Sequence, residues 1–391
     1  MSKLIVFLGN KLISTDTFVP IALTLKAKNK NLNIDFYCFN RDTEEAIKNN
    51  TVLYDIIKAL GHLKRIGDYR NSFLPNIFKK IYLFFNLILL VFSNYIFKCK
   101  YVHFGALEKW PLNILYYFNS SRTVFIESNC WGWEKIVFDI ADIKRKRNNS
   151  YIIKSAEYLA SFSMDWPALS NEANKNIKKF NITPSRLWPE WINYLDREES
   201  SIWLKECKKL NIDSNSKVVV FILGWLGPLD FYNSENSGLL LLENTLQILR
   251  DLMEEYTILV KPHPNTNIKV LNNFIKKNNI KNICFTNLHV SLLSRKSLFV
   301  ICNYFSMSLI DAHYSKTTTI EYSSYNKKAL KITNNKSVIS RYVSYFINDD
   351  PEMLRDIIRE IKKNNININL EKRDKANLTI NDERLIKILA S

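Results

Sequence analysis

The tetrapeptide Lys261-Pro262-His263-Pro264 places a cation and an imidazole at the end of an apolar run, residues 256–260. That run is short and rich in β-branched residues, which is typical of a buried strand. Each proline removes a backbone donor and directs the chain out of the sheet. Ligands of open α/β sheets bind at the carboxyl ends of strands, and a lysine with a histidine there suits a phosphate. A plain strand-ending turn is the alternative interpretation.

A glycine-containing loop follows the apolar run at residues 217–223. Gly224 and Gly227 allow the backbone to approach a ligand closely, and Trp225 between them offers a flat face for a base or a sugar. Gly-Pro pairs are also common in ordinary turns, so this loop alone predicts little. Together with the Lys-Pro-His-Pro loop it indicates a ligand-binding edge, provided that the sheet is parallel.

A third loop, residues 303–308, leads from a strand into a helical stretch and contains Ser306 and Ser308. Ser306 is a good helix N-cap, and a helix N-terminus with hydroxyls and free backbone donors binds phosphate. Capping alone is the competing explanation. Beyond that helix, Glu321 is a candidate acceptor for ribose hydroxyls, with a surface turn as its alternative. The three loops converge on one crevice if their strands are parallel neighbours.

The elements that position these loops form two similar halves. In the first half, apolar runs at residues 4–8 and 34–39 enclose a helical stretch, which is the pattern of a parallel βαβ unit. Residues 101–104 and 123–126 read as further strands, and residues 151–180 read as helical. The second half repeats this alternation. We expect an α/β protein with two Rossmann-like domains that face each other across a cleft.

The predicted domain boundaries follow from this alternation. We expect a first domain at residues 1–185, a linker at 186–215, a second domain at 216–375 and a C-terminal helix at 376–391 that packs back on the first domain. The paired acids before Pro351 are explained by the start of a helix rather than by a metal site.

The composition, with 47% hydrophobic and 24% charged residues, is that of a globular protein. Six scattered cysteines without a CxxC pair favour reduced thiols in a cytoplasmic protein and no metal site, and we expect no secretory signal. The net charge of +17 indicates an anionic partner, either nucleic acid or a membrane surface. No nucleic-acid-binding motif accompanies the charge, so we expect no nucleic acid partner.

An apolar stretch with lysines at both ends favours the membrane. Residues 81–92 follow Lys79-Lys80 and precede Lys98 and Lys100. Between Lys80 and Lys98 the uncharged stretch has about 17 residues, interrupted by Asn86 and Asn94, and is shorter than the roughly 20 that a span requires. We therefore expect a basic apolar helix near residues 79–100 that is half core and half interfacial, with peripheral attachment to an anionic inner membrane. An ordinary buried helix with solvated lysine ends is the alternative.

The order of the three loops resembles bacterial sialyltransferases of the lipooligosaccharide and capsule type. More broadly it resembles HP-motif glycosyltransferases of the two-domain GT-B fold, which include Kdo transferases and relatives that use CDP-polyols. The resemblance covers roughly residues 217–325 and is carried by Gly-x-x-Gly-Pro-Leu at 224–229, Lys-Pro-His-Pro and the serine-rich turn. In those relatives the histidine and the serine pair contact the phosphate of a cytidine nucleotide. The resemblance implies the same role for His263, Ser306 and Ser308.

The resemblance also implies a catalytic base, an acid just after a strand of the first domain. Glu127 stands at that position, with Glu134 in reserve, and a cap or salt-bridge role is the alternative. Trp131 and Trp133 in the same loop would stack on acceptor sugars unless they are core residues. His103 is a further candidate for base or acceptor binding, with a structural histidine as its alternative.

The function implied is a glycosyltransferase that moves a CMP-linked keto-acid sugar, such as sialic acid or Kdo, onto a bacterial surface glycan or glycolipid. No DxD-like motif stands at the nucleotide site, so we expect a phosphate clamp without a metal ion or other cofactor. Two alternatives stay open. One is a transferase that uses a nucleoside-diphosphate sugar or a CDP-polyol, and the other is a non-enzymatic basic scaffold at the membrane. We expect a cytoplasmic location, peripheral to the inner membrane.

Overall fold

The computed structural model describes residues 3–9, 12–67, 76–108, 110–119, 122–127, 152–162, 167–263, 266, 268–277, 283–363 and 377–390. The chain divides into two compact units, and it passes from the first to the second within α9 (Pro189–Leu210). Most of the segment expected as a linker is therefore one long helix. The C-terminal helix α16 (Ile380–Ala390) belongs to unit 1, where Asn29 donates a hydrogen bond of 2.9 Å to the carbonyl of Ala390.

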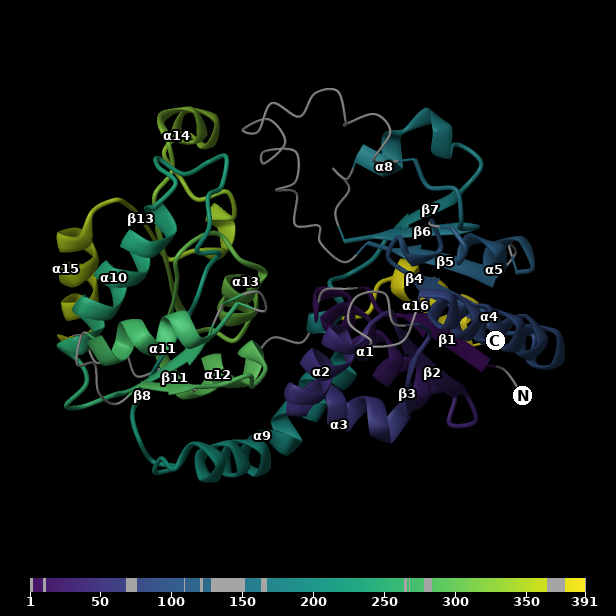
Figure 1. The fold of residues 1–391 in the computed structure, drawn as a ribbon, viewed down its shortest axis with the longest axis horizontal. Coiled ribbons are helices and arrows are strands. Elements are labelled where there is room, and N and C mark those ends of the chain that lie inside the picture. Colours follow the sequence, from purple (N-terminus) through teal and green to yellow (C-terminus); the bar gives the residue numbers. More distant parts are fainter. Residues whose placement is uncertain are drawn as a thin grey trace. The chain divides into compact units, whose positions relative to one another are not determined.

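Unit 1 contains a seven-stranded parallel sheet with the order β3-β2-β1-β4-β5-β6-β7 (Figure 1). The strands are β1 (Lys3–Phe7), β2 (Asn33–Cys38), β3 (Gly61–Arg65), β4 (Lys100–His103), β5 (Thr123–Ile126), β6 (Tyr158–Ser161) and β7 (Lys178–Asn181). The prediction of helix over residues 151–180 was wrong, because β6 and β7 lie there. Neither strand is a long apolar run. Strand β6 forms by pairing with β5 and β7 by pairing with β6, which local propensity does not reveal.

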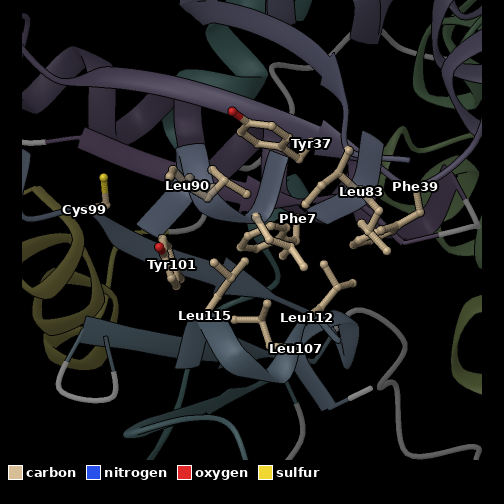
Figure 2. Close-up of a cluster of buried hydrophobic side chains, with 13 residues drawn as sticks. Phe7, Tyr37, Phe39, Leu83, Leu90, Cys99, Tyr101, Leu107, Leu112 and Leu115 are labelled. Atoms are coloured by element: carbon tan, nitrogen blue, oxygen red, sulfur yellow. The ribbon is translucent and has the colours of Figure 1, made fainter. Parts of the chain in front are cut away.

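The helices of unit 1 include α1 (Leu12–Lys28), α2 (Arg41–Asn49), α3 (Thr51–Leu60), α4 (Asn76–Phe97), α5 (Asn113–Tyr117) and the single turn α8 (Pro167–Ser170). Helix α4 is the crossover from the edge strand β3 back to β4 in the middle of the sheet. It packs Leu83, Leu87 and Leu90 against Phe7 and Tyr101 of the central strands (Figure 2). The crossover thus fixes which stripe of α4 is buried.

Unit 2 contains a six-stranded parallel sheet with the order β10-β9-β8-β11-β12-β13. The strands are β8 (Val218–Ile222), β9 (Thr257–Lys261), β10 (Ile283–Phe285), β11 (Ser297–Cys302), β12 (Thr318–Ser323) and β13 (Tyr345–Asn348). The helices are α10 (Ser237–Arg250), α11 (Ile268–Lys277), α12 (Val290–Lys296), α13 (Met307–Tyr314), α14 (Lys327–Thr333) and α15 (Pro351–Lys363). Asp350 caps α15 by accepting from the amide of Met353 at 2.9 Å, so the acidic pair marks a helix start.

In both sheets the first strand lies in the interior, the next two extend the sheet to one side, and the following strands extend it to the other. This is the strand order of Rossmann folds, and the point where the order reverses is where such sheets bind ligands. In unit 2 the reversal falls between β8 and β11, which pair directly.

Candidate functional site

The three predicted loops of unit 2 leave the sheet at the same edge. Their strands β9, β8 and β11 are consecutive parallel neighbours, so the loops at their carboxyl ends emerge side by side. The loops after β8 and β9 are in contact, because the rings of Trp225 and His263 lie edge to face with their centroids 5.8 Å apart. Both side chains are partly exposed. An imidazole and an indole thus stand together at the switch point of the sheet.

The loops after β8 and β11 also meet. A Cβ placed on Gly224 would lie 2.7 Å from Cδ1 of Tyr304, so the glycine lets the first turn of one loop pass against the ring of the other. A second close approach involves Gly238 at the start of α10, where a Cβ would lie 2.8 Å from the carbonyl oxygens of Trp225 and Leu226. The glycine loop is therefore held between α10 and the loop that follows β11.

Replacing Gly224 by alanine should destabilise unit 2 by about 1–2 kcal/mol, because the new methyl group overlaps the Tyr304 ring. The same clash should displace the loop from the carboxyl end of β8. A double-mutant cycle in chemical denaturation tests this: Tyr304→Ala should relieve most of the penalty of Gly224→Ala. Strictly additive effects of the two substitutions would show that the contact does not constrain the loop.

Ser306 caps helix α13 as the sequence predicts. Its Oγ accepts a hydrogen bond from the amide of Ser308 at 3.2 Å, and both serines are partly exposed. The first amides of α13 give that end of the helix a partial positive charge, which favours an anion. The serine hydroxyls and this helix end therefore stand on the same edge of the sheet as His263.

Lys261 has a different environment from the one its charge suggested. Its ammonium group donates to the carbonyl oxygens of Asn287 and Leu288, at 3.2 and 2.9 Å. These carbonyls lie in the loop after β10, so the lysine connects the end of β9 to the neighbouring loop. These bonds brace the end of β9, and the role of Lys261 in donor binding stays a prediction.

Glu321 is buried in the interior of unit 2, which does not fit the predicted contact with ribose hydroxyls. One carboxyl oxygen accepts from Ser323 at 3.0 Å and from Tyr325 at 2.8 Å, and the other accepts from Ser337. Burial raises the pKa of Glu321 to about 7, against these three hydroxyl hydrogen bonds, which lower it. The residue lies inside β12, so the alternative of a surface turn is wrong as well.

Glu127 and His103 stand at the ends of β5 and β4 in unit 1, and both are buried. The carboxylate of Glu127 accepts from Ser161 Oγ at 2.5 Å. His103 Nε2 lies 2.9 Å from the carbonyl oxygen of Ser155, and the amide of Leu107 points at its Nδ1 at 3.5 Å. This environment favours the structural interpretation of His103. Trp131, Trp133 and Glu134, the other predicted acceptor residues, lie outside the described residues.

Sequence reasoning missed three residues at the unit 2 edge. Tyr304 and Gly238 shape the glycine loop as described above. Asn303, at the end of β11, donates from Nδ2 to Thr245 Oγ1 at 2.9 Å and so connects this edge to α10. Of the three, Gly238 had a usable signal, because a glycine permits a close approach of another backbone segment.

These two sheets define the class of fold: the chain has two Rossmann-like domains, the GT-B fold. No protein-family model matches the chain, and no curated protein matches its sequence. Similarity is found among solved structures instead. One is UDP-GlcNAc 2-epimerase from Neisseria meningitidis bound to UDP-GlcNAc, with 12% identity, a TM-score of 0.56, and coverage of 100% of this chain and 99% of that one.

Two further structures share the fold. The S. aureus MnaA structure with UDP has 12% identity and a TM-score of 0.51, and the match covers 100% of this chain and 91% of that one. A glycosyltransferase from Rickettsia africae has 12% identity and a TM-score of 0.50, with 99% and 93% coverage. At this level of identity the similarity establishes the fold.

Proposed function

We propose that the protein is a glycosyltransferase that binds a nucleotide sugar at the carboxyl edge of the unit 2 sheet. The observation that carries this proposal is that three loops leave the carboxyl ends of the neighbouring strands β9, β8 and β11. Trp225 contacts His263, and Gly224 lies against Tyr304 in the loop that leads into α13. An imidazole and a helix N-terminus suit the phosphate of a nucleotide, and a flat aromatic ring suits its base or sugar. The GT-B fold supports the proposal, because one of the similar structures is bound to UDP-GlcNAc and another to UDP.

In the proposed reaction, the acceptor hydroxyl attacks the anomeric carbon, the bond from that carbon to the donor phosphate oxygen breaks, and the acceptor proton passes to a base. Negative charge grows on the leaving phosphate, where His263, the hydroxyls of Ser306 and Ser308 and the amides of α13 would stabilise it. Glu127 is the proposed base. Its support is its position directly after β5, at the carboxyl end of a parallel strand, where α/β sheets bind ligands.

For the donor we propose a CMP-linked keto-acid sugar, with a bacterial surface glycan or glycolipid as the acceptor. The support is the succession of Gly-x-x-Gly-Pro-Leu, Lys-Pro-His-Pro and the serine-rich turn, now placed on three neighbouring strands. A UDP-linked donor is the second candidate, and the UDP ligands of the similar structures favour it.

Calorimetric titration of the full chain with CMP, UMP and UDP tests both levels of the proposal. We expect saturable binding of CMP, at least about tenfold tighter than that of UMP or UDP. Tighter binding of UDP would replace the CMP donor with the second candidate while keeping the transferase. Absence of saturable binding for all three nucleotides would contradict the transferase itself and favour a non-enzymatic scaffold.

A further inference from the structure

Helix α4 presents an unusual outer face for a surface helix. Its inner stripe is buried against the sheet, as described above, whereas Phe85, Leu89, Phe92 and Ile96 on the opposite side are each 60–70% exposed. Their spacing of three to four residues places them on one face. A surface helix of a water-soluble domain normally has polar residues there. No residue from 81 to 97 carries a charge.

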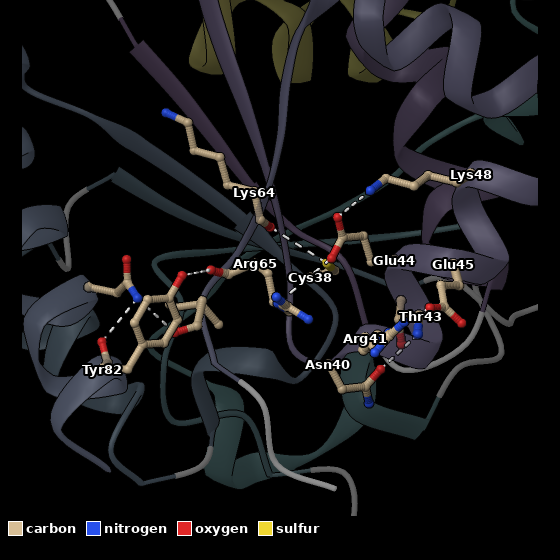
Figure 3. Close-up of polar contacts among 12 residues, drawn as sticks. Cys38, Asn40, Arg41, Thr43, Glu44, Glu45, Lys48, Lys64, Arg65 and Tyr82 are labelled. Carbon is tan, nitrogen blue, oxygen red and sulfur yellow. Dashed lines mark hydrogen bonds and ion pairs between the residues drawn. The ribbon is translucent and has the colours of Figure 1, made fainter. Parts of the chain in front are cut away.

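The two asparagines that interrupt the apolar run form hydrogen bonds within unit 1, so they do not make the outer face polar. Asn86 donates to the carbonyl of Ile66 at 3.2 Å, and Asn94 donates to the carbonyl of Phe118 at 2.9 Å. The hydroxyl of Tyr82 donates to the carbonyl of Arg65 at 3.4 Å, so the end of β3 is attached to α4 as well (Figure 3). These bonds hold the helix flat against its own sheet.

A groove of about 640 Å³ runs along one side of α4. Its far wall is formed by Trp110, Pro111, Ile114 and Phe118, and apart from Lys80 the groove is lined by apolar side chains. Trp110 is 76% exposed at its rim. An exposed tryptophan beside an apolar groove is typical of residues that lie at the level of lipid headgroups.

The other side of α4 faces a cavity of about 500 Å³ whose lining includes Lys3, Lys64 and Arg65. Both lysines are paired with one buried carboxylate, Asp35, at 2.9 and 2.8 Å. Burial raises the pKa of Asp35, but its bonds to the two lysines outweigh that effect and hold the pKa below its ordinary value. One carboxylate balances one of the two ammonium charges, so this cavity favours an anion.

We propose that α4, with its apolar groove and its basic cavity, is a membrane-binding surface that lies in the headgroup region of a bilayer of anionic phospholipids. The outer face enters the acyl region, and the basic cavity with Lys80 and Lys98 at the helix ends contacts lipid phosphates. Charge complementarity selects this occupant, because a partner that met only the apolar face would leave the flanking cations unused.

The helix lies on the membrane rather than crossing it. Residues 80–97 are long and apolar enough to span, with a mean hydropathy of 1.7. However, the flanking strands β3 and β4 belong to one sheet on the same side of the helix, and the buried leucines are part of that domain's core. A span would require α4 to leave this core.

Vesicle co-sedimentation of the full chain tests the proposal. We expect binding to phosphatidylcholine vesicles with about one third phosphatidylglycerol to be at least about tenfold tighter than to phosphatidylcholine alone, and to weaken with salt. The triple variant Phe85→Ser, Leu89→Ser, Phe92→Ser should lose more than about tenfold in affinity. A matched control, Leu239→Ser with Leu240→Ser, removes exposed leucines from α10 in unit 2 and should bind as the parent does.

The charge contribution is tested separately. Lys80→Gln with Lys98→Gln should weaken binding to the anionic vesicles by roughly fivefold per cation and leave binding to neutral vesicles unchanged. The matched control is Lys205→Gln with Lys208→Gln on α9. Loss of binding in both pairs alike would show a nonspecific effect of net charge and overturn the proposed site.

Other outcomes are also decisive. Equal vesicle binding by the triple variant and the parent overturns the proposal. If the parent protein does not bind vesicles but is a dimer in sedimentation velocity, and the triple variant is a monomer, the occupant is a second copy of the chain. Nucleotide titration of the triple variant keeps the two proposals apart, because binding of CMP or UDP at unit 2 should not change.

Discussion

Replacing His263 by alanine is expected to lower sugar transfer by at least about 100-fold while unit 2 stays folded. The imidazole is partly exposed and packs edge to face on Trp225. Its removal therefore deletes a group that would contact the phosphate and leaves no cavity in the hydrophobic core. Nucleotide affinity should fall with it. Nucleotide release in the presence of acceptor measures the transfer, and calorimetry measures the binding.

Two comparisons make this result specific to the site. His62→Ala removes an exposed histidine from β3 in unit 1 and should leave transfer and binding unchanged. Glu127→Gln should abolish transfer but preserve nucleotide affinity, because it removes the proposed base and leaves the phosphate site intact. Full activity in His263→Ala would remove this residue from the site. Unchanged transfer in Glu127→Gln would assign the base elsewhere.

The second large effect is a pH dependence of stability that has opposite signs in the two units. Burial lowers the pKa of His103 in unit 1 to about 4, against the hydrogen bond from its ring to Ser155, which raises it. Between pH 6.5 and 4, His103 is therefore protonated in the unfolded chain and neutral in the folded unit. The contribution of His103 to stability is complete above pH 6.5 and is lost as the pH falls towards 4, at a total of about 3 kcal/mol.

Glu321 in unit 2 acts in the other direction. Because its pKa in the folded protein is raised to about 7, the folded carboxyl keeps a proton that the unfolded chain has released. Its contribution is complete below about pH 4.5 and is lost as the pH rises through 7, again by about 3 kcal/mol. From pH 4.5 to 6.5, rising pH should therefore stabilise unit 1 and destabilise unit 2.

Hydrogen exchange read by mass spectrometry separates the two effects, because peptides of β4 and β12 report on unit 1 and unit 2. Glu321→Gln should abolish the pH dependence in β12 peptides and leave that of β4 unchanged. His103→Gln, which keeps a donor and an acceptor, should do the reverse. A common slope in both units, or slopes that survive these substitutions, would contradict the assignment.

Several strands were determined by the sequence alone. The apolar runs predicted β1, β2, β4, β5, β8 and β9 to within a residue at each end. Central strands of parallel sheets are buried on both faces, so they must be continuous apolar runs, and that pattern is local. The glycine, proline and serine residues that end β8, β9 and β11 are local signals as well, which is why the edge that carries His263 was predictable.

Tertiary pairing decided the strands near the sheet edges. Gly61–Arg65 and Lys178–Asn181 are short and polar, and each becomes a strand because a neighbour offers it an unpaired edge. The environments of the polar side chains were decided in the same way. Glu321 and His263 both belong to the second half. Glu321 lies within β12 and accepts hydroxyl hydrogen bonds, whereas His263 lies on a loop beside Trp225.

The sequence of α4 by itself determined an apolar helix bordered by lysines, because composition and spacing are local properties. Which side of that helix is covered depended on the crossover from β3 to β4, which presses Leu83, Leu87 and Leu90 onto the sheet and leaves Phe85 and Phe92 outward. Burial is a relation between distant segments, so a run of residues that is apolar on every side cannot encode it alone.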